Sequence, residues 1–235
     1  MNAILEIKCL RGGYLPGVDI LQDVNLAIEI GETVGIIGLN GSGKSTLGKA
    51  IVNLIPIRQG EILYKGVSVM DMPASGLSQQ GIVIMQQGGK VFRTMSVWDN
   101  LQLAFNTKDC QVMDTLTEFI PLLQRPKSEL RYRMADQLSG GERHQLALAM
   151  TLAQQPQLVV LDEPSAGLSP KAVDEMYRML TLAKERLGIS TLLIEQNIAK
   201  AITFCNRCAL LSHGRIMQIF TNQNIEEIER KMFNK

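Results

Sequence analysis

The sequence Gly38-Leu39-Asn40-Gly41-Ser42-Gly43-Lys44-Ser45 says more about the fold than any other part of the chain. It has the spacing G-x-x-x-x-G-K-[ST] of a loop that surrounds phosphate groups with backbone N–H donors. Its glycines leave these donors unobstructed, and a following helix adds the positive end of its dipole. Lys44 provides a point charge for the β- and γ-phosphates, and the Ser45 hydroxyl is a hard ligand for Mg²⁺. We therefore predict a strand, this loop and then a helix, with a triphosphate bound at the loop.

Short apolar runs without polar alternation occur on both sides of the loop, which is typical of strands buried on both faces of a parallel sheet. They lie at residues 33–37, 82–85, 158–161, 191–194 and 209–211. Apolar residues at helical spacing lie between them, namely Leu47, Ala50, Ile51 and Leu54 in one segment and Val173, Met176, Tyr177 and Leu180 in another. Gly188 is placed to end the second helix. The alternation of strands and helices predicts an α/β fold.

Two regions depart from this alternation. The first 30 or so residues alternate as antiparallel β-strands do, with Gly12, Gly13, Pro16 and Gly17 as turn residues. Residues 92–143 contain helical patterns but no buried strand. Because the chain has no internal repeat and no low-complexity linker, we expect a single domain over residues 1–235, with a helical subdomain inserted at approximately 90–145.

The amino-acid composition argues against several classes of function. The 235 residues are 46% hydrophobic and 20% charged, and 24 basic against 23 acidic residues give a net charge of +1. Such a balance argues against a nucleic-acid partner. No apolar run has the ~18–20 residues needed to span a bilayer, and the acidic start does not resemble a signal peptide. We expect a cytoplasmic protein in which Cys205 and Cys208 are reduced thiols rather than part of a zinc site.

A phosphate loop needs a second carboxylate for its metal, and the run Leu158-Val159-Val160-Leu161 is followed by two acids, Asp162 and Glu163. Asp162 is predicted to hold Mg²⁺, and a role as a helix cap is its alternative. Glu163, as the next residue, points elsewhere and can address the attacking water.

Ser139-Gly140-Gly141-Glu142 is a second motif that can bind an anion. Ser139 with Glu142 three residues later forms a capping box that opens a helix. The two glycines leave bare N–H groups in the first turn of that helix. Ordinary capping is the alternative interpretation of this motif.

The order of these motifs, a Walker A loop at 38–45, Leu138-Ser139-Gly140-Gly141-Glu142, and then Asp162-Glu163, resembles the ATP-binding cassette (ABC) family over essentially the whole chain. The resemblance implies a P-loop ATPase that takes ATP and Mg²⁺. It places an adenine-stacking aromatic at Tyr14, a Q-loop residue near Mg²⁺ at Gln87, and a D-loop at 165–170. The implied nucleotide contacts are Tyr14, Gly38, Asn40, Gly41, Ser42, Gly43, Lys44, Ser45, Thr46, Gln87, Ser139, Gly140 and Gly141. The implied metal ligands are Ser45, Gln87 and Asp162, and the implied catalytic residues are Glu163, Lys44 and Gln196.

Two positions depart from the usual family pattern. Gln196 stands where most cassettes have the switch histidine, and Gln can donate a hydrogen bond but cannot titrate. Ser169 stands where many members have Asp. Together with residues 81–101 and Glu195-Gln196-Asn197, these departures resemble the ATPases of branched-chain amino-acid importers. Urea uptake, lipid or lipopolysaccharide export (whose ATPase keeps the histidine) and a regulatory cassette outside transport are the alternatives.

In this family two cassettes meet head to tail, so that the Walker A loop of one faces the Ser139-Gly140-Gly141 end of the other. The resemblance therefore implies a second ABC ATPase subunit, identical or related, as a partner. It also implies transmembrane permease subunits that hold the chain at the inner face of the membrane, and an extracytoplasmic solute-binding protein. A nucleic-acid cassette and a P-loop kinase or GTPase are the competing classes; the signature motif at 138–142 opposes the second of these.

Overall fold

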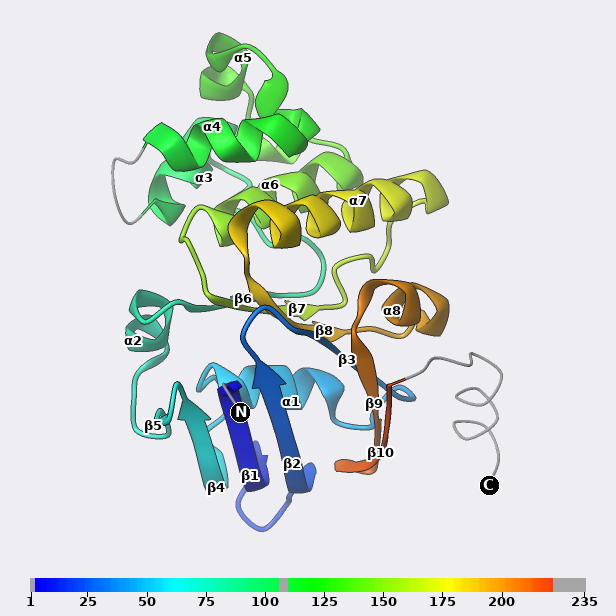
Figure 1. Ribbon diagram of the computed structural model, residues 1–235. Coiled ribbons are helices and arrows are strands. Elements are labelled where there is room, and N and C mark those ends of the chain that lie inside the picture. The colour runs from blue at the N-terminus through cyan, green and yellow to red at the C-terminus, as the bar shows by residue number, and fades with distance from the viewer. Residues whose placement is uncertain (1–2, 106–109, 222–235) are drawn as a thin grey trace.

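Two β-sheets organise the computed structural model, which describes residues 3–105 and 110–221 (Figure 1). The larger sheet has six strands, in the order β10-β9-β3-β8-β7-β6, and the five from β9 to β6 are parallel while β10 pairs with β9 antiparallel. These strands are β3 (Thr33–Ile37), β6 (Ile82–Met85), β7 (Leu158–Asp162), β8 (Ser190–Ile194), β9 (Arg207–Ser212) and β10 (Arg215–Phe220). All five apolar runs predicted as strands are confirmed.

The second sheet is antiparallel, in the order β2-β1-β4-β5. Its strands are β1 (Ala3–Gly13), β2 (Leu21–Glu29), β4 (Ile57–Tyr64) and β5 (Val67–Ser68). The antiparallel region expected at the start of the chain is confirmed by β1 and β2, whereas β4 and β5 were not anticipated. Gly60 interrupts the pattern of β4: its φ is +98°, and a Cβ there would lie 2.6 Å from the carbonyl oxygen of Lys8. The glycine therefore accommodates the irregular pairing with β1.

The helices in chain order are α1 (Lys44–Ile51), α2 (Ala74–Gln79), α3 (Val97–Ala104), α4 (Cys110–Phe119), α5 (Lys127–Tyr132), α6 (Gly140–Leu152), α7 (Pro170–Leu187) and α8 (Ile198–Phe204). Helix α7 ends as expected, because Gly188 adopts the left-handed conformation (φ +63°) and its N–H bonds to the carbonyl of Lys184. The expectation for Leu54 is wrong: α1 ends at Ile51, and the Leu54 side chain is 43% exposed. None of the helices that the structure describes is long and apolar enough to cross a membrane.

The six-stranded sheet separates two hydrophobic cores, and successive residues of its strands face opposite cores. In β7, Leu158 and Val160 pack with α1 and the antiparallel sheet, whereas Val159 and Leu161 pack with α6 and α7. Burial on both faces explains why these strands are uninterrupted apolar runs.

The segment between β6 and α6 carries α3, α4 and α5; α4 and α5 lie beyond α6 and α7, α3 lies beside α6, and all three are far from the antiparallel sheet (Figure 1). The fully buried Asn100 fixes its entry, because the side chain accepts the N–H of Phe92 and donates to the carbonyls of Phe92 and Ser96. Helices α3, α4 and α5 lie within the range of approximately 90–145 for which an inserted helical subdomain is expected.

Candidate active site

Four neighbouring parallel strands end at the same edge of the larger sheet, and each delivers one part of the candidate site. In the sheet order β3-β8-β7-β6, β3 leads into the loop at 38–43 and β8 into Glu195 and Gln196. Strand β7 ends at Asp162 and Glu163, and β6 leads toward Gln87. Crevices outside the carboxyl ends of strands are where open α/β sheets bind ligands.

The loop between β3 and α1 passes unusually close to the end of β9. A Cβ atom on Gly38 would lie 2.2 Å from the carbonyl oxygen of Leu211, so no other residue fits without a shift of the backbone. Gly41 and Gly43 have φ of +79° and +104°, a region that favours glycine. The Ser42 hydroxyl is buried and has no hydrogen-bond partner among the described residues. An unsatisfied buried hydroxyl costs about 1–3 kcal/mol, so the loop retains a donor for a ligand.

Lys44 is the buried cation of the site, with only 4% of its surface exposed. Its ammonium donates to the carbonyl oxygens of Gly38 and Leu39, at 2.8 and 3.0 Å. Burial lowers the pKa of Lys44, and the nearby carboxylates of Glu163, Asp162 and Glu195 oppose that change. The loop therefore holds a positive charge against its own carbonyl oxygens at Gly38 and Leu39.

Asp162 lies against the first turn of α1, where its Oδ1 accepts a hydrogen bond from the Ser45 hydroxyl at 2.9 Å. The side chain is 3% exposed, and burial raises the pKa of Asp162, as does the negative charge of Glu163. The Ser45 hydrogen bond acts in the opposite direction. A hydroxyl and a carboxylate brought together in this way are the oxygen ligands that a hard cation prefers.

Glu163 is held by two amide side chains, one on each carboxylate oxygen. The Nε2 of Gln87 donates to Oε2 at 2.6 Å, and the Nε2 of Gln196 donates to Oε1 at 2.5 Å. The Glu163 backbone has a φ of +48°, which is strained for a residue other than glycine, and its N–H bonds to the carbonyl of Ile194. A carboxylate held in one orientation next to a metal site can orient or deprotonate a water molecule.

The N-terminus of α6 forms the predicted capping box. The Ser139 hydroxyl accepts the N–H of Glu142, and the Glu142 carboxylate accepts the N–H of Ser139 at 2.8 Å. Burial alone would raise the pKa of Glu142, but this backbone bond and the ion pairs with Arg133 and Arg125 lower it. Ser139 and Gly140 are exposed to solvent.

The structure brings six of the predicted residues together: Gln87, Lys44, Ser45, Asp162, Glu163 and Gln196. Among the residues that the structure describes, no hydrogen bond joins the loop at 38–45 to Ser139, Gly140 or Gly141. Tyr14 lies between β1 and β2, 40% exposed, with the Lys49 ammonium 6.0 Å from its ring centroid. Asn40 is exposed in the loop, and Thr46 is buried in α1.

Glu195 is a buried acid of the site that the sequence analysis did not single out. It ends an apolar run in the same way that Asp162 does, and that pattern could have identified it. Its side chain is 3% exposed and accepts a hydrogen bond from the Ser165 hydroxyl at 2.5 Å.

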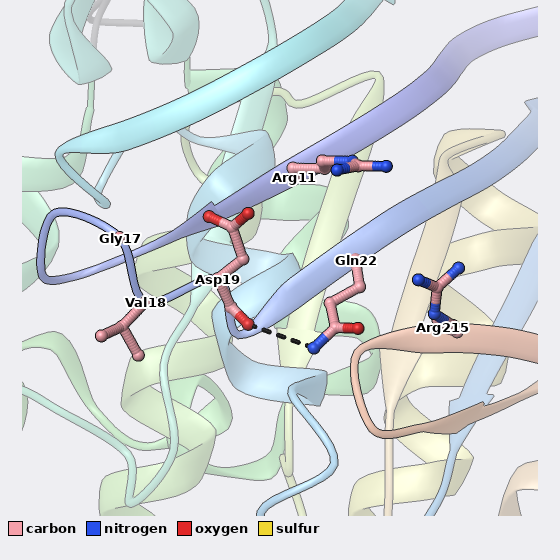
Figure 2. A pocket seen from close by; sticks show the side chains of 6 residues that line it. All are labelled: Arg11, Gly17, Val18, Asp19, Gln22 and Arg215. Atoms are coloured by element: carbon pink, nitrogen blue, oxygen red, sulfur yellow. Dashed lines mark hydrogen bonds between the residues drawn. The ribbon is translucent and has the colours of Figure 1, made fainter.

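A cavity of about 420 Å³ lies apart from these residues, between β1, the start of β2 and the start of β10 (Figure 2). It is lined by Arg11, Gly17, Val18, Asp19, Gln22 and Arg215, and the Gln22 amide bonds to the Asp19 carbonyl. None of the predicted site residues lines it.

The chain is similar to known proteins over most of its length. The family model described as ABC transporter matches residues 21–166, more than half of the chain. The chain is 34% identical over 209 residues to the high-affinity branched-chain amino acid transport ATP-binding protein BraG of Pseudomonas aeruginosa, covering 87% of each protein. It is 31% identical over 219 residues to the lipopolysaccharide export system ATP-binding protein LptB of Escherichia coli, covering 92% of this chain and 89% of LptB.

Among solved structures, cbiO1 from Clostridium perfringens, a part of the ABC transporter complex cbiONQ, has a TM-score of 0.82 and 25% identity to this chain. The match covers 99% of this chain and 93% of cbiO1.

Proposed function

The chain belongs to the ABC transporter family as an ATP-binding, ATP-hydrolysing subunit, and from this premise we propose that it drives the uptake of branched-chain or related amino acids. The observation that carries the ATPase site is Glu163, a buried carboxylate fixed by two amides beside the Ser45–Asp162 pair. The amino-acid cargo rests on the likeness to BraG.

The residues present fit a magnesium–ATP complex. Within the described ranges, the Ser42 hydroxyl has no hydrogen-bond partner and the buried Lys44 ammonium has no hydrogen-bonded carboxylate, so both are donors that suit an anionic ligand. Ser45 and Asp162 supply oxygens for Mg²⁺, and Gln87, whose amide bonds to the neighbouring Glu163, is the third ligand. When bound, the cation offsets negative charge on the transferred phosphoryl group.

The chain's own groups then divide the work of hydrolysis. Lys44 and the N–H groups of loop 38–45 bind the phosphates. Glu163 orients the attacking water and accepts its proton, and the Gln87 and Gln196 amides hold that carboxylate in place. Tyr14 offers an exposed ring on which adenine stacks.

The exposed N-terminus of α6 completes the site of a second cassette. Its Ser139 hydroxyl and the N–H groups of Gly140 and Gly141 bind the nucleotide held by the loop of the opposing copy, so hydrolysis waits for two chains to meet. The partner is a second copy or a related ABC ATPase. The pair acts at the inner face of the membrane on transmembrane permease subunits, which an extracytoplasmic solute-binding protein supplies with cargo.

Export of lipopolysaccharide is the second candidate, because the chain resembles LptB nearly as well as BraG. One experiment separates the two. Cells carrying Lys44→Ala are tested for uptake of labelled leucine and for surface lipopolysaccharide, and Lys65→Ala, in the β4–β5 turn, is the matched control.

We expect leucine uptake to be lost in Lys44→Ala and kept in Lys65→Ala, with permease proteins co-purifying with both variants. Normal leucine uptake with a defect in surface lipopolysaccharide would refute amino-acid import and favour export. If neither process changes while both variants are expressed, both cargo assignments are wrong.

A further inference from the structure

Glu195 is a buried carboxylate for which ATP binding and hydrolysis, as described so far, have no use. It follows β8 directly, is 3% exposed, and lies close enough to Lys44 that its charge opposes the lowering of the pKa of that lysine by burial. Burying a carboxylate is costly unless hydrogen bonds replace the lost water. Its contacts therefore indicate what it does.

Three donors surround the Glu195 carboxylate, and they come from two loops. Oε1 accepts the Ser165 hydroxyl at 2.5 Å, from the loop that follows β7. Oε2 accepts the backbone N–H groups of Gln196 at 3.0 Å and of Asn197 at 3.2 Å. The carboxylate thus fixes the backbone at the residue whose side chain holds Glu163.

These contacts form a continuous path from Ser165 through Glu195 and Gln196 to Glu163. The Ser165 end belongs to a loop whose Gly167 and Ser169 are exposed to solvent before α7 begins. The other end is the carboxylate that addresses water. A displacement of Glu195 would move Gln196, and with it one of the two amides that orient Glu163.

We propose that Glu195 is a positioning residue for hydrolysis: it fixes Gln196, which orients Glu163, and it anchors this arrangement to the loop at Ser165. The inference rests on the proposed role of Glu163 as the group that addresses water. It predicts a larger loss in kcat than in ATP affinity, because the Glu195 carboxylate hydrogen-bonds to Ser165, Gln196 and Asn197 and acts on loop 38–45 through its charge near Lys44.

The test compares Glu195→Ala with Glu195→Asp, Glu195→Gln and Ser165→Ala in the full-length chain. Ala leaves the Ser165 hydroxyl and the N–H groups of Gln196 and Asn197 without an acceptor. Asp keeps the negative charge, but its side chain is one methylene shorter, so the carboxylate lies farther from these donors. Gln keeps one oxygen acceptor and presents an amide donor to the Ser165 oxygen, so it is the conservative rescue. Glu32→Gln, which alters a glutamate paired with Arg207 far from the site, is the control for loss of a carboxylate.

We expect kcat to fall about 10- to 100-fold in Glu195→Ala and about tenfold in Glu195→Asp, with the dissociation constant for ATP within twofold of wild type, because displacement of an orienting group by about 1 Å can cost 10²-fold in rate. Glu195→Gln and Glu32→Gln should stay within about threefold of wild type, and Ser165→Ala should fall between these limits.

Two readouts distinguish positioning from mere stability. Combining Glu195→Ala with Glu163→Gln should cost no more than Glu163→Gln alone, because both changes act through one carboxylate. Amide hydrogen exchange should speed up at Gln196 and Asn197 and not in β1 or β2. Unchanged kcat in folded Glu195→Asp, additive losses in the double variant, or unchanged exchange at Gln196 would each overturn the proposal.

Failure of the proposed function gives a different result. A wild-type chain that binds no ATP, or a Glu163→Gln variant that hydrolyses it normally, would refute the role of the site itself. Normal wild-type turnover that depends on Glu163 but not on Glu195 would refute only the positioning role.

Discussion

Replacing Ser139 by aspartate separates the two roles that its position at the N-terminus of α6 allows. The Ser139 hydroxyl accepts the N–H of Glu142, so the residue is an N-cap in this chain. The same hydroxyl is exposed and lies beside two glycines at the positive end of a helix dipole, where it can also bind a phosphate presented by a second chain. Asp is as good an N-cap as Ser, but its negative charge repels a triphosphate.

The N-cap role and the phosphate-binding role of Ser139 predict different changes in stability and in turnover. Losing the cap in Ser139→Ala costs about 1 kcal/mol, which lowers the unfolding midpoint of a chain of this size by about 2–4 °C. Ser139→Asp keeps the cap and the wild-type midpoint. If the hydroxyl also helps to bind the transition state, both variants lose about 10²–10³-fold in turnover, the usual cost of one preorganised donor.

Thermal unfolding and steady-state ATP hydrolysis of the purified chain give the two readouts. Ser96→Ala is the matched control, because Ser96 caps α3 in the same way and lies outside the candidate site. It should lose stability as Ser139→Ala does and keep its turnover. A Ser139→Asp variant that hydrolyses ATP at the wild-type rate would refute the reasoning, since the hydroxyl would then act only as a cap.

The other predictions concern the buried residues of the site and of the sheet. Glu163→Gln should bind ATP without hydrolysing it and accumulate a dimer; size-exclusion chromatography with ATP and Mg²⁺ that shows only monomer would count against this. Because burial raises the pKa of Asp162, the ionised carboxylate destabilises the folded chain; this cost is full above the folded-state pKa and is lost as the pH falls through it toward the lower pKa of the unfolded chain. Asp162→Asn should therefore abolish Mg²⁺-dependent hydrolysis and raise the unfolding midpoint without nucleotide, by an amount that decreases on acidification; a midpoint below wild type at neutral pH would contradict it. Gly35→Ala should lose about 1–3 kcal/mol, because the new Cβ would lie 2.8 Å from the Cys208 Sγ, and Cys208→Ala in the same chain should recover part of that loss in calorimetry.

The parts of the site that follow one another along the chain could be predicted from the sequence. Three motifs can be recognised because their residues are close together in the sequence: the Walker A loop, Asp162-Glu163 and the capping box at Ser139. The structure has all three in the expected local conformation. Parallel strands read as apolar runs because both faces of the sheet are covered. The resemblance to a family then added Gln87 and Gln196, which lie far apart in sequence.

What escaped prediction depends on contacts between distant residues. Glu195 acquires a role only when Ser165, 30 residues earlier, is folded against it. Strand β4 was missed because Gly60 breaks its pattern, and that glycine is explained by the nearby carbonyl of Lys8 in β1. Leu54 fits the helical period of α1, but the helix ends three residues earlier, at Ile51. The spacing of apolar residues predicts which face of a helix is buried. It does not predict the residue at which the helix ends, because tertiary contacts decide that.

The distribution of unsatisfied donors gives a physical reason for two chains to cooperate. In the part of the chain that the structure describes, the buried Ser42 hydroxyl of the loop at 38–45 has no partner, and the N-terminus of α6 presents Gly140 at an exposed surface and Gly141 partly buried. Within the described part of one chain no hydrogen bond connects these two ends. A nucleotide bound to the loop alone would be covered on one side only, and water would compete for its remaining phosphate oxygens. With a second copy that presents its α6 end, the phosphate oxygens would accept from both sets of donors at once and that water would be excluded, which is why the proposed hydrolysis depends on the pair while binding needs one chain.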